Sequence, residues 1–491
     1  HAMRILKDKF PSIVDALEPG GSGNMYAGLN AEESEALKEV TQMGFPPKSW
    51  FGYKDMGIHG FLVLYQGVTM ADNSYFTKDF WNKPGYLGYK PTKSLLNARI
   101  QKLSTIKTSI GISEAVSLGL VEAVSENDRG SADNAWKSMG GKEGGRPVAF
   151  ELTDQLPNVG FIGGDLIIKS GAAAGKTLQL TKAENNKVAL APTNPPQLLL
   201  LIKQGDTVQV DNSNFLAIQT YHRHQVPGPE YKVWNQFRDA QGKPIYPQRP
   251  MQLGPLFTRA ASGTLPVGKF KGKMILLGSL LDREAFPWQC DWYRERVKEQ
   301  LGTETDNNFK LWYTENALHG DLASQLGDPT HAVSYTGVLQ QALLDLSDWV
   351  EKDIEPAKST VYKIENGQVI VPTSASERKG IQPIPNLLVN GKKRADIKSG
   401  KTLTFVATID IPTNSGKIVA ADFDFDGSGK FATQGKIVTK NSSTAIVQVT
   451  RKFDKKGTFL PTIRVALQRE DDAKTAFTRI QNLDRVRVVV E

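Results

Sequence analysis

Two side chains that can move a proton together, Asp282 and His319, each follow a run that predicts a β-strand. Residues 273–277 read as an apolar strand of the kind buried on both faces of a parallel sheet, and residues 309–314 read as the next strand. The carboxyl ends of parallel strands meet at one edge of a sheet, so we expect the carboxylate and the imidazole side by side. A carboxylate fixes the tautomer of an imidazole and stabilises its protonated form. The two residues therefore predict the acid and the base of a catalytic triad.

The elements around this pair follow an alternating order. A helix is predicted over residues 288–300, between the two strands, and another over residues 334–352. Strand, helix, strand and helix in succession indicate an α/β fold. Taken singly, an aspartate after a strand or a histidine before a glycine is more often a loop residue. The strand context of both, in the order acid then histidine, favours a functional pair.

The same region resembles a known superfamily. Residues 273–288 (KMILLGSLLDREAFPW) resemble the acid strand of α/β-hydrolases, and residues 311–320 (LWYTENALHG) resemble their histidine strand. The helix that ends near Trp349 resembles their closing helix. The resemblance covers residues 227–362 and is greatest to exported bacterial esterases of the tannase and hydroxybutyrate-oligomer hydrolase type. It implies a serine-type hydrolase of a small ester or oligoester, without metal or cofactor, that is exported to the periplasm or outside the cell.

A triad also needs a serine on a strand–turn–helix elbow of the form G-x-S-x-G, and the chain has none. Two near matches precede Asp282. Ser22 has no strand before it, and Ser113 reads as the N-cap of a helix over residues 114–118. The sheet is also short of strands. We therefore expect the nucleophile in an N-terminal half that this chain lacks, and an isolated chain that is inactive. The alternative is a non-catalytic binding or scaffold protein on a decayed hydrolase frame.

Three further side chains are candidates for contact with the substrate. His222 and His224 are expected on one face of a strand near the active-site mouth, and Trp288 begins the helix after the acid. Two histidines on one face can also form half of a zinc site, but few other histidines are available, so we predict no metal site. A structural role is the open alternative for both.

The rest of the chain divides by its pattern. Asn30 and Glu33 form a capping box at the start of a helix. Residues 418–427 and 453–463 resemble the PKD-type immunoglobulin-like sandwich. The expected α/β fold is a partial α/β-hydrolase sheet with four additions, namely a helical cap (1–145), an inserted β-sandwich or barrel (146–226), a linker (363–385) and a C-terminal immunoglobulin-like β-sandwich (386–491). Seven short strands are expected in the inserted module, two of them over residues 198–202 and 215–220.

Composition excludes several classes of protein. The formal net charge is +8, but the lysines are spread along the chain without a motif that reads nucleic acid, so no nucleic-acid partner is expected. The longest apolar run is too short to span a bilayer. Cys290 is the single cysteine, which excludes an internal disulfide. Weak calcium binding by Asp422, Asp424 and Asp426 stays open, although alternation predicts that these three carboxylates face water.

Overall fold

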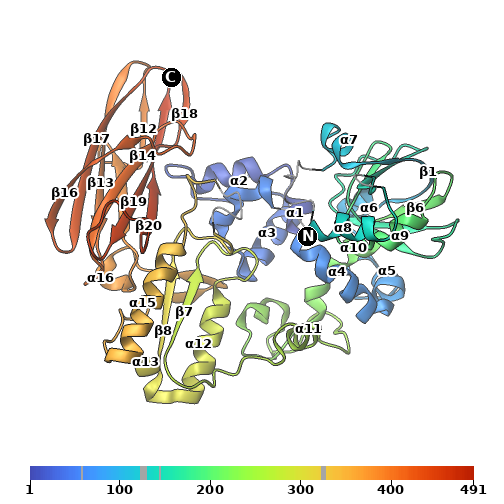
Figure 1. Ribbon diagram of the computed structural model, residues 1–491, viewed down its shortest axis with the longest axis horizontal. Helices are drawn as coiled ribbons and strands as arrows, with labels where there is room; N and C mark the ends of the chain where they lie inside the picture. The colour runs from blue at the N-terminus through green and yellow to red at the C-terminus, as the bar shows by residue number, and fades with distance from the viewer. Residues whose placement is uncertain (57–58, 122–129, 143–144, 322–327) are drawn as a thin grey trace. The chain divides into compact units, whose positions relative to one another are not determined.

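The computed structural model describes residues 1–56, 59–121, 130–142, 145–321 and 328–491, and mixes helices with several sheets (Figure 1). The chain forms two compact units. Unit 1 comprises residues 1–5, 57–228 and 237–264, and unit 2 comprises residues 6–56, 229–236 and 265–491.

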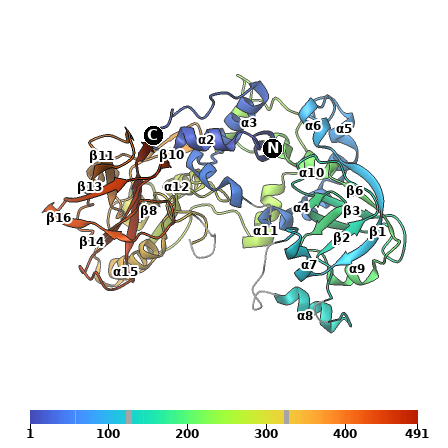
Figure 2. The same ribbon diagram turned by 90° about the horizontal axis from the view of Figure 1, so that it is seen from above.

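Unit 1 is built around a closed six-stranded antiparallel barrel (Figure 2). Its strands pair in the order β1 (Gln101–Ile110), β2 (Ala149–Leu152), β5 (Lys187–Leu190), β4 (Thr177–Glu184), β3 (Gly164–Ile168) and β6 (Thr207–Asp211), which closes on β1. Alternate residues of each strand fill the interior, including Phe150, Leu152, Leu166, Ile168, Leu178, Leu180, Val188, Val208 and Val210. This period of two is what places one side of every strand in the core.

Unit 1 also contains helices and short helical turns. They are α1 (Ala2–Ile5), α4 (His59–Ala71), η2 (Tyr75–Asp79), α5 (Phe80–Asn82), α6 (Lys93–Ala98), α7 (Ile112–Ser117), α8 (Gly130–Ser138), α9 (Pro196–Leu201), α10 (Ser213–Ile218), η4 (Tyr221–His224) and α11 (Leu253–Ser262).

The barrel differs from the predicted β-module in three places. Its first strand, β1, comes from the segment expected to be a helical cap. Residues 198–202 and 215–220, both predicted as strands, fall largely in the helices α9 and α10. A short apolar run fits a buried strand and a buried helix equally well, and Pro196 in the first turn decides for a helix in α9.

Unit 2 contains the predicted strand–helix–strand–helix segment. Strand β7 (Met274–Ser279) pairs in parallel with β8 (Phe309–Thr314), and α12 (Trp288–Leu301) connects them. The helix α15 (Thr336–Lys352) follows, and Figure 1 shows the two strands between α12 and α15. All six residues of β8 are buried. Strand β7, which its apolar run predicts to be buried on both faces, is only partly buried over most of its length. The four predicted elements are thereby confirmed.

The other helices of unit 2 are α2 (Phe10–Leu17), α3 (Ala31–Gln42), η1 (Pro47–Asp55), η6 (Gly302–Glu304), α13 (Thr305–Asn308) and α16 (Ala375–Arg378). A short 3-10 helix, η5 (Lys232–Phe237), ends at the boundary between the units. The capping box of α3 is confirmed: Asn30 Oδ1 accepts from the Glu33 amide at 3.0 Å, and Glu33 Oε2 accepts from the Asn30 amide at 2.8 Å.

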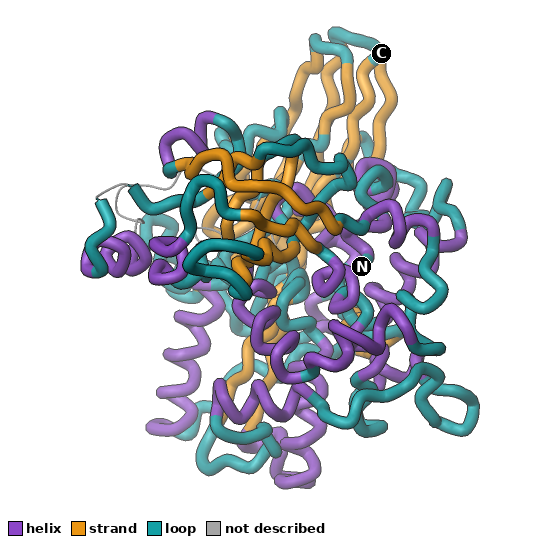
Figure 3. The backbone as a smooth tube through the Cα atoms, turned by 90° about the vertical axis from the view of Figure 1, so that its right-hand side faces the viewer, coloured by secondary structure: helices purple, strands orange, loops and turns teal. Residues whose placement is uncertain are grey.

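The C-terminal residues form a β-sandwich (Figure 3). One sheet has the order β11 (Ile384–Val389), β13 (Lys401–Asp410), β17 (Thr444–Phe453) and β16 (Lys436–Asn441). The second has the order β15 (Thr433–Gln434), β14 (Lys417–Asp424), β19 (Thr462–Gln468) and β20 (Ile480–Arg485), and a third has β12 (Arg394–Ile397), β21 (Arg487–Val490) and β18 (Gly457–Phe459). Phe405, Phe423 and Val465 lie in their shared core.

The segment predicted to be a linker, 363–385, carries ordered structure instead. Strands β9 (Lys363–Glu365) and β10 (Gln368–Ile370) pair with each other, and α16 follows. Arg378 is buried and forms an ion pair of 2.7 Å with Glu315, directly after β8. The sandwich core also includes Trp312 of β8. The serine- and proline-rich composition therefore marks short structural elements that are packed onto their neighbours, and the linker prediction is wrong.

Candidate active site

Backbone hydrogen bonds hold the loops after β7 and β8 together. The Leu280 amide donates to the carbonyl of Thr314, and the Leu281 amide donates to the carbonyl of Ala317, each at 2.9 Å. Leu281 and Leu318 also share a small buried cluster. The two loops are thereby fixed to each other, and each carries one of the predicted side chains.

Asp282 and His319 meet as expected from the sequence. Oδ2 of Asp282 lies 3.0 Å from Nδ1 of His319. Oδ1 accepts hydrogen bonds from the amides of Glu284 at 2.9 Å and Ala285 at 2.8 Å. The backbone turn therefore fixes the carboxylate, and the carboxylate fixes the imidazole with Nδ1 as the donor. That tautomer leaves Nε2 as the atom that can accept a proton.

The surroundings of His319 favour its charged form. The hydrogen bond that His319 donates to Asp282 raises the pKa of His319 above its usual value. The charges of Asp282 and Glu284 act in the same direction, against the effect of partial burial. Nε2 lies 3.7 Å from the carboxylate of Glu284. Because 46% of the imidazole is exposed, water screens part of this effect. The ring is positioned to accept a proton and to stabilise it.

A cavity of about 430 Å³ adjoins the pair and lies along the end of β7. It is lined in part by Leu277 and Ser279 of β7, by Tyr293 of α12 and by Leu339 of α15. Cys290 also lines it, but burial raises the pKa of this thiol to about 12, so the thiolate needed for attack is scarce at neutral pH. Ser279 is the serine that lines this cavity, and the sequence analysis did not single it out.

The two serines weighed from the sequence lie elsewhere. Ser113 is an exposed residue in the first turn of α7, in unit 1, with Gly111 as the N-cap. The prediction that Ser113 caps the helix is therefore wrong by two residues. Ser22 lies in an exposed turn of unit 2, where its Oγ accepts from the Asn24 amide at 3.2 Å. Neither serine has the positive φ that marks a strained turn, and neither is among the residues that line the cavity.

Trp288 is not among the residues that line the cavity, although its neighbours Pro287 and Gln289 are. Its Nε1 donates to the carbonyl of Met43 at 2.9 Å, and its ring lies against Gly44, where an added Cβ would approach within 2.2 Å. These contacts give the indole a structural role, because they attach α12 to the end of α3.

The predicted pair of histidines belongs to unit 1 and lies in the 3-10 helix η4, not on a strand. His224 is buried, its ring nitrogen Nδ1 lies 2.7 Å from the Pro247 carbonyl, and burial lowers its pKa to about 4. The ring of His222 lies 5.6 Å from that of Phe237. Neither histidine lines the cavity beside Asp282. A neutral, packed imidazole is the arrangement expected of a structural histidine.

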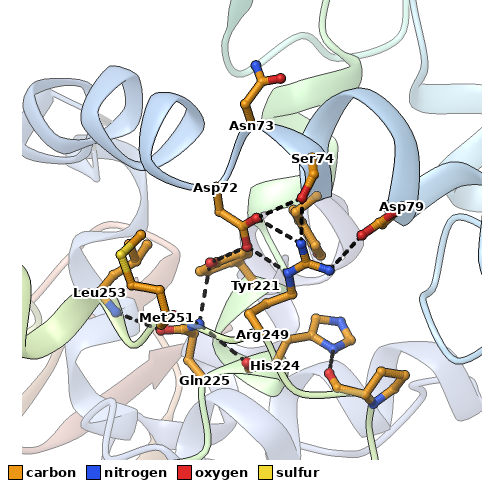
Figure 4. Close-up of polar contacts among 12 residues, drawn as sticks. Asp72, Asn73, Ser74, Asp79, Tyr221, His224, Gln225, Arg249, Met251 and Leu253 are labelled. Carbon is orange, nitrogen blue, oxygen red and sulfur yellow. Dashed lines mark hydrogen bonds and ion pairs between the residues drawn. The ribbon is translucent and has the colours of Figure 1, made fainter.

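Beside His224 lies a buried ionic network that the sequence did not reveal (Figure 4). Arg249 forms two hydrogen bonds with Asp72, at 2.7 and 2.8 Å, and one with Asp79 at 2.8 Å. Tyr221 donates to the same Asp72 carboxylate at 2.8 Å. Every polar atom of the guanidinium is therefore engaged within the protein, which marks the network as structural.

The three aspartates of the C-terminal sandwich do not all face water. Phe423 is buried as predicted, but Asp424 is buried too, with 2% of its surface exposed. Its Oδ1 accepts from the amides of Asp426 and Gly427, at 3.0 and 2.8 Å. Backbone amides of the same loop thus bind this carboxylate, and the described residues contain no group of three or more acidic, histidine or cysteine side chains able to hold a metal ion.

Comparison with known proteins gives distant similarities. No family model and no curated protein matches the chain. Among solved structures it is similar to the PKD domain of an M14-like peptidase from a Thermoplasmatales archaeon (15% identity, 23% of this chain and 98% of that one, TM-score 0.17). It is similar also to the CARDB domain of a Pyrococcus furiosus protein (13%, 23% and 97%, TM-score 0.16). The neutral ceramidase of Pseudomonas aeruginosa follows with 9% identity over 44% of this chain and 37% of that one, at a TM-score of 0.12. At such TM-scores the assignment of the C-terminal sandwich depends on its own strand pairings.

Across the described residues, no helix is both long enough and apolar enough to cross a membrane.

Proposed function

We propose that Asp282 and His319 are the acid and base of a serine-type carboxylic-ester hydrolase of the α/β-hydrolase type. The substrate is a small ester or oligoester, and the nucleophile is carried by a polypeptide segment outside the described residues. The observation that carries this proposal is the hydrogen bond of 3.0 Å between the two side chains at the carboxyl ends of two parallel strands. Export from the cell belongs to the same proposal and rests on the resemblance to exported esterases.

The chemistry follows from the tautomer. Asp282 holds the proton on Nδ1 of His319, so Nε2 takes the proton of a serine hydroxyl as its oxygen attacks the ester carbonyl. His319 then gives that proton to the departing alcohol, and a water molecule releases the acid from the serine by the same route. The cavity of about 430 Å³ has the size of a site for a small molecule. Its Leu339 and Tyr293 offer apolar contact to the acyl or alcohol part of an ester.

A second candidate function is a non-catalytic binding or scaffold protein. It is favoured by one observation: no described serine has both a place beside His319 Nε2 and the strained backbone of a nucleophile elbow. The two functions differ in one measurable property, the reactivity of a serine.

A fluorophosphonate probe, read by mass spectrometry, tests the proposal. The chain alone is expected to remain unlabelled. The chain extended upstream within its own gene, to include a G-x-S-x-G segment, is expected to be labelled stoichiometrically at that serine, and His319→Ala in the same protein is expected to abolish labelling. Labelling of the chain alone at Ser279, Ser22 or Ser113 would contradict the absent nucleophile. No labelling in either protein would leave the scaffold function.

A further inference from the structure

Strand β7 has one edge whose backbone groups have no partner in the described chain. Its other edge pairs with β8, and the amide of Leu280 points to β8 because it donates to Thr314. Backbone groups alternate in direction along a strand, so those of Ile275 and Leu277 point to the opposite edge. Neither residue has a hydrogen bond on that side within the described residues. An open edge of this kind is a template for another strand.

The side chains of β7 belong to an interior strand, although the strand lies at an edge. Ile275 and Leu277 pack toward the core that includes α15, and Met274 and Leu276 pack toward the cluster that includes α12. Helices therefore cover both faces, as in the middle of a three-layer α/β sheet. Yet these four side chains are only half-buried, whereas all of β8 is buried. The exposed part of these β7 side chains lies at the open edge of the strand, where no neighbouring strand packs against them.

Helix α15 continues this surface. Its inner stripe, which includes Val338, Ala342 and Trp349, is buried in unit 2. A second apolar stripe, at the helical spacing of four, three and four residues, runs through Leu339, Leu343, Leu346 and Val350. Leu339 is 41% exposed, Leu343 60% and Val350 62%. Leu339 also lines the cavity along β7, so the stripe and the strand edge meet there.

We propose that the groove between α12 and α15, floored by the open edge of β7, binds a parallel, apolar β-strand of a complementing polypeptide. The inference depends on the proposed function in one respect, namely that this polypeptide also carries the nucleophile. Parallel addition places the carboxyl end of the new strand at the end of the sheet where Asp282 and His319 lie, as the carboxyl ends of β7 and β8 already do. A two-stranded parallel sheet is also smaller than parallel sheets usually are, which favours extension.

A second copy of the chain fits this edge less well. Two copies related by a two-fold axis would pair their β7 strands antiparallel. The acid–histidine pairs of the two copies would then lie at opposite ends of the joined sheet, and neither would gain a neighbouring strand end. Parallel addition of a strand from the nucleophile-bearing segment, and not from a second copy, is therefore the arrangement to which we commit.

The test uses the full chain with selective ¹⁵N-leucine labelling, because Leu276 and Leu277 are neighbours whose amides point to opposite edges. The probe is a synthetic peptide with the sequence of residues 271–280, an apolar strand suited to burial on both faces. At a peptide concentration that fills about nine-tenths of the sites, hydrogen exchange of the Leu277 amide is expected to slow by about tenfold, because only the free tenth of the protein exchanges. Hydrogen exchange of the Leu276 amide is expected to stay unchanged. A nitroxide at the carboxyl end of the peptide is expected to broaden the signal of Leu280 more than that of Leu276.

Two variants provide the controls. Leu339→Lys combined with Leu343→Lys places two charges on the exposed stripe without touching the core, and is expected to abolish the protection of Leu277. Val438→Lys, on the exposed surface of β16, changes a similarly exposed apolar residue far along the chain and is expected to leave binding intact.

Several results would overturn the docking surface. They are an absence of protection at Leu277, an antiparallel pattern of broadening, or binding that survives the double lysine variant. Protection of Leu277 that rises with the concentration of the chain alone would assign the edge to a second copy. None of these readouts involves a reactive serine, so a failed docking surface and a failed hydrolase function are told apart by the strand-binding and fluorophosphonate experiments.

Discussion

Asp282 supports both a histidine and a backbone turn, and two substitutions separate these roles. Its Oδ2 lies 3.0 Å from His319 Nδ1, and its Oδ1 accepts from the amides of Glu284 and Ala285 at 2.9 and 2.8 Å. Asp282→Asn keeps an oxygen for the turn but removes the negative charge that faces His319. Asp282→Ala removes all three hydrogen bonds.

The contacts set the expected costs in unfolding free energy. A hydrogen bond contributes about 0.5–1.5 kcal/mol net. The bond to His319 is charge-assisted, but its partner is half-exposed, so Asp282→Asn is expected to cost about 1 kcal/mol or less. Asp282→Ala also loses two bonds to the turn, where the aspartate side chain is 12% exposed, and is expected to cost about 2–4 kcal/mol.

The pH dependence gives the sharper test. The folded pKa of His319 is raised, chiefly by Asp282. Its stabilising contribution is therefore complete below the unfolded imidazole pKa of about 6.5 and is lost as pH rises through the folded value. In urea denaturation, the difference between the wild type and Asp282→Asn should shrink from about pH 5.5 to about pH 9, while the difference between the Asn and Ala variants persists. A pH-independent difference for Asp282→Asn, or equal costs for the two variants, would refute this division of roles.

Three further predictions concern buried groups. In unit 1, Arg249→Met leaves the Asp72 and Asp79 carboxylates buried without their shared cation. Thermal denaturation should show a free energy of unfolding lower by about 3–5 kcal/mol, and an unchanged stability would contradict the network. Burial raises the pKa of Asp165 to about 7, whereas the pKa of an aspartate in the unfolded chain is about 3.9. The folded state therefore loses stability as pH rises from about 4 to about 7. Asp165→Asn should be more stable than the wild type near about pH 8 but not near about pH 4, and the reverse order would exclude this reasoning. Cys290, with its pKa near 12, should react with iodoacetamide at pH 8 at least about a hundredfold more slowly in the native than in the urea-unfolded chain, and equal rates would show that the thiol is not held in a buried site.

The sequence was most informative where periodicity is strong and partners are close. Strands β7 and β8 and the helices α12 and α15 were predictable because their apolar patterns are long and follow in order. The strand β1 was missed because its partners, β2 and β6, lie about fifty and a hundred residues later in the chain and supply the cover that its own sequence does not indicate.

The candidate site was predictable in the same measure. Asp282 and His319 follow strands whose ends had to coincide, so their approach could be expected from the topology. Ser279 contributes to the site from the end of β7, and Glu284 contributes through the turn after it, whose path depends on the hydrogen bonds that Asp282 accepts from the backbone. The burial of Asp424 was missed for a similar reason, because the loop after β14 folds back to donate its amides.

The most direct test of the central claim is the rate of p-nitrophenyl butyrate hydrolysis by the chain extended upstream to include a G-x-S-x-G segment. The acid and base roles predict that His319→Ala lowers kcat by several orders of magnitude and that Asp282→Asn lowers it by about 10⁴ while KM changes little. Glu299→Gln, which removes an exposed carboxylate of α12 that does not line the cavity, is the matched control and should retain most of the activity. Turnover by the His319→Ala variant equal to that of the wild type would contradict the account.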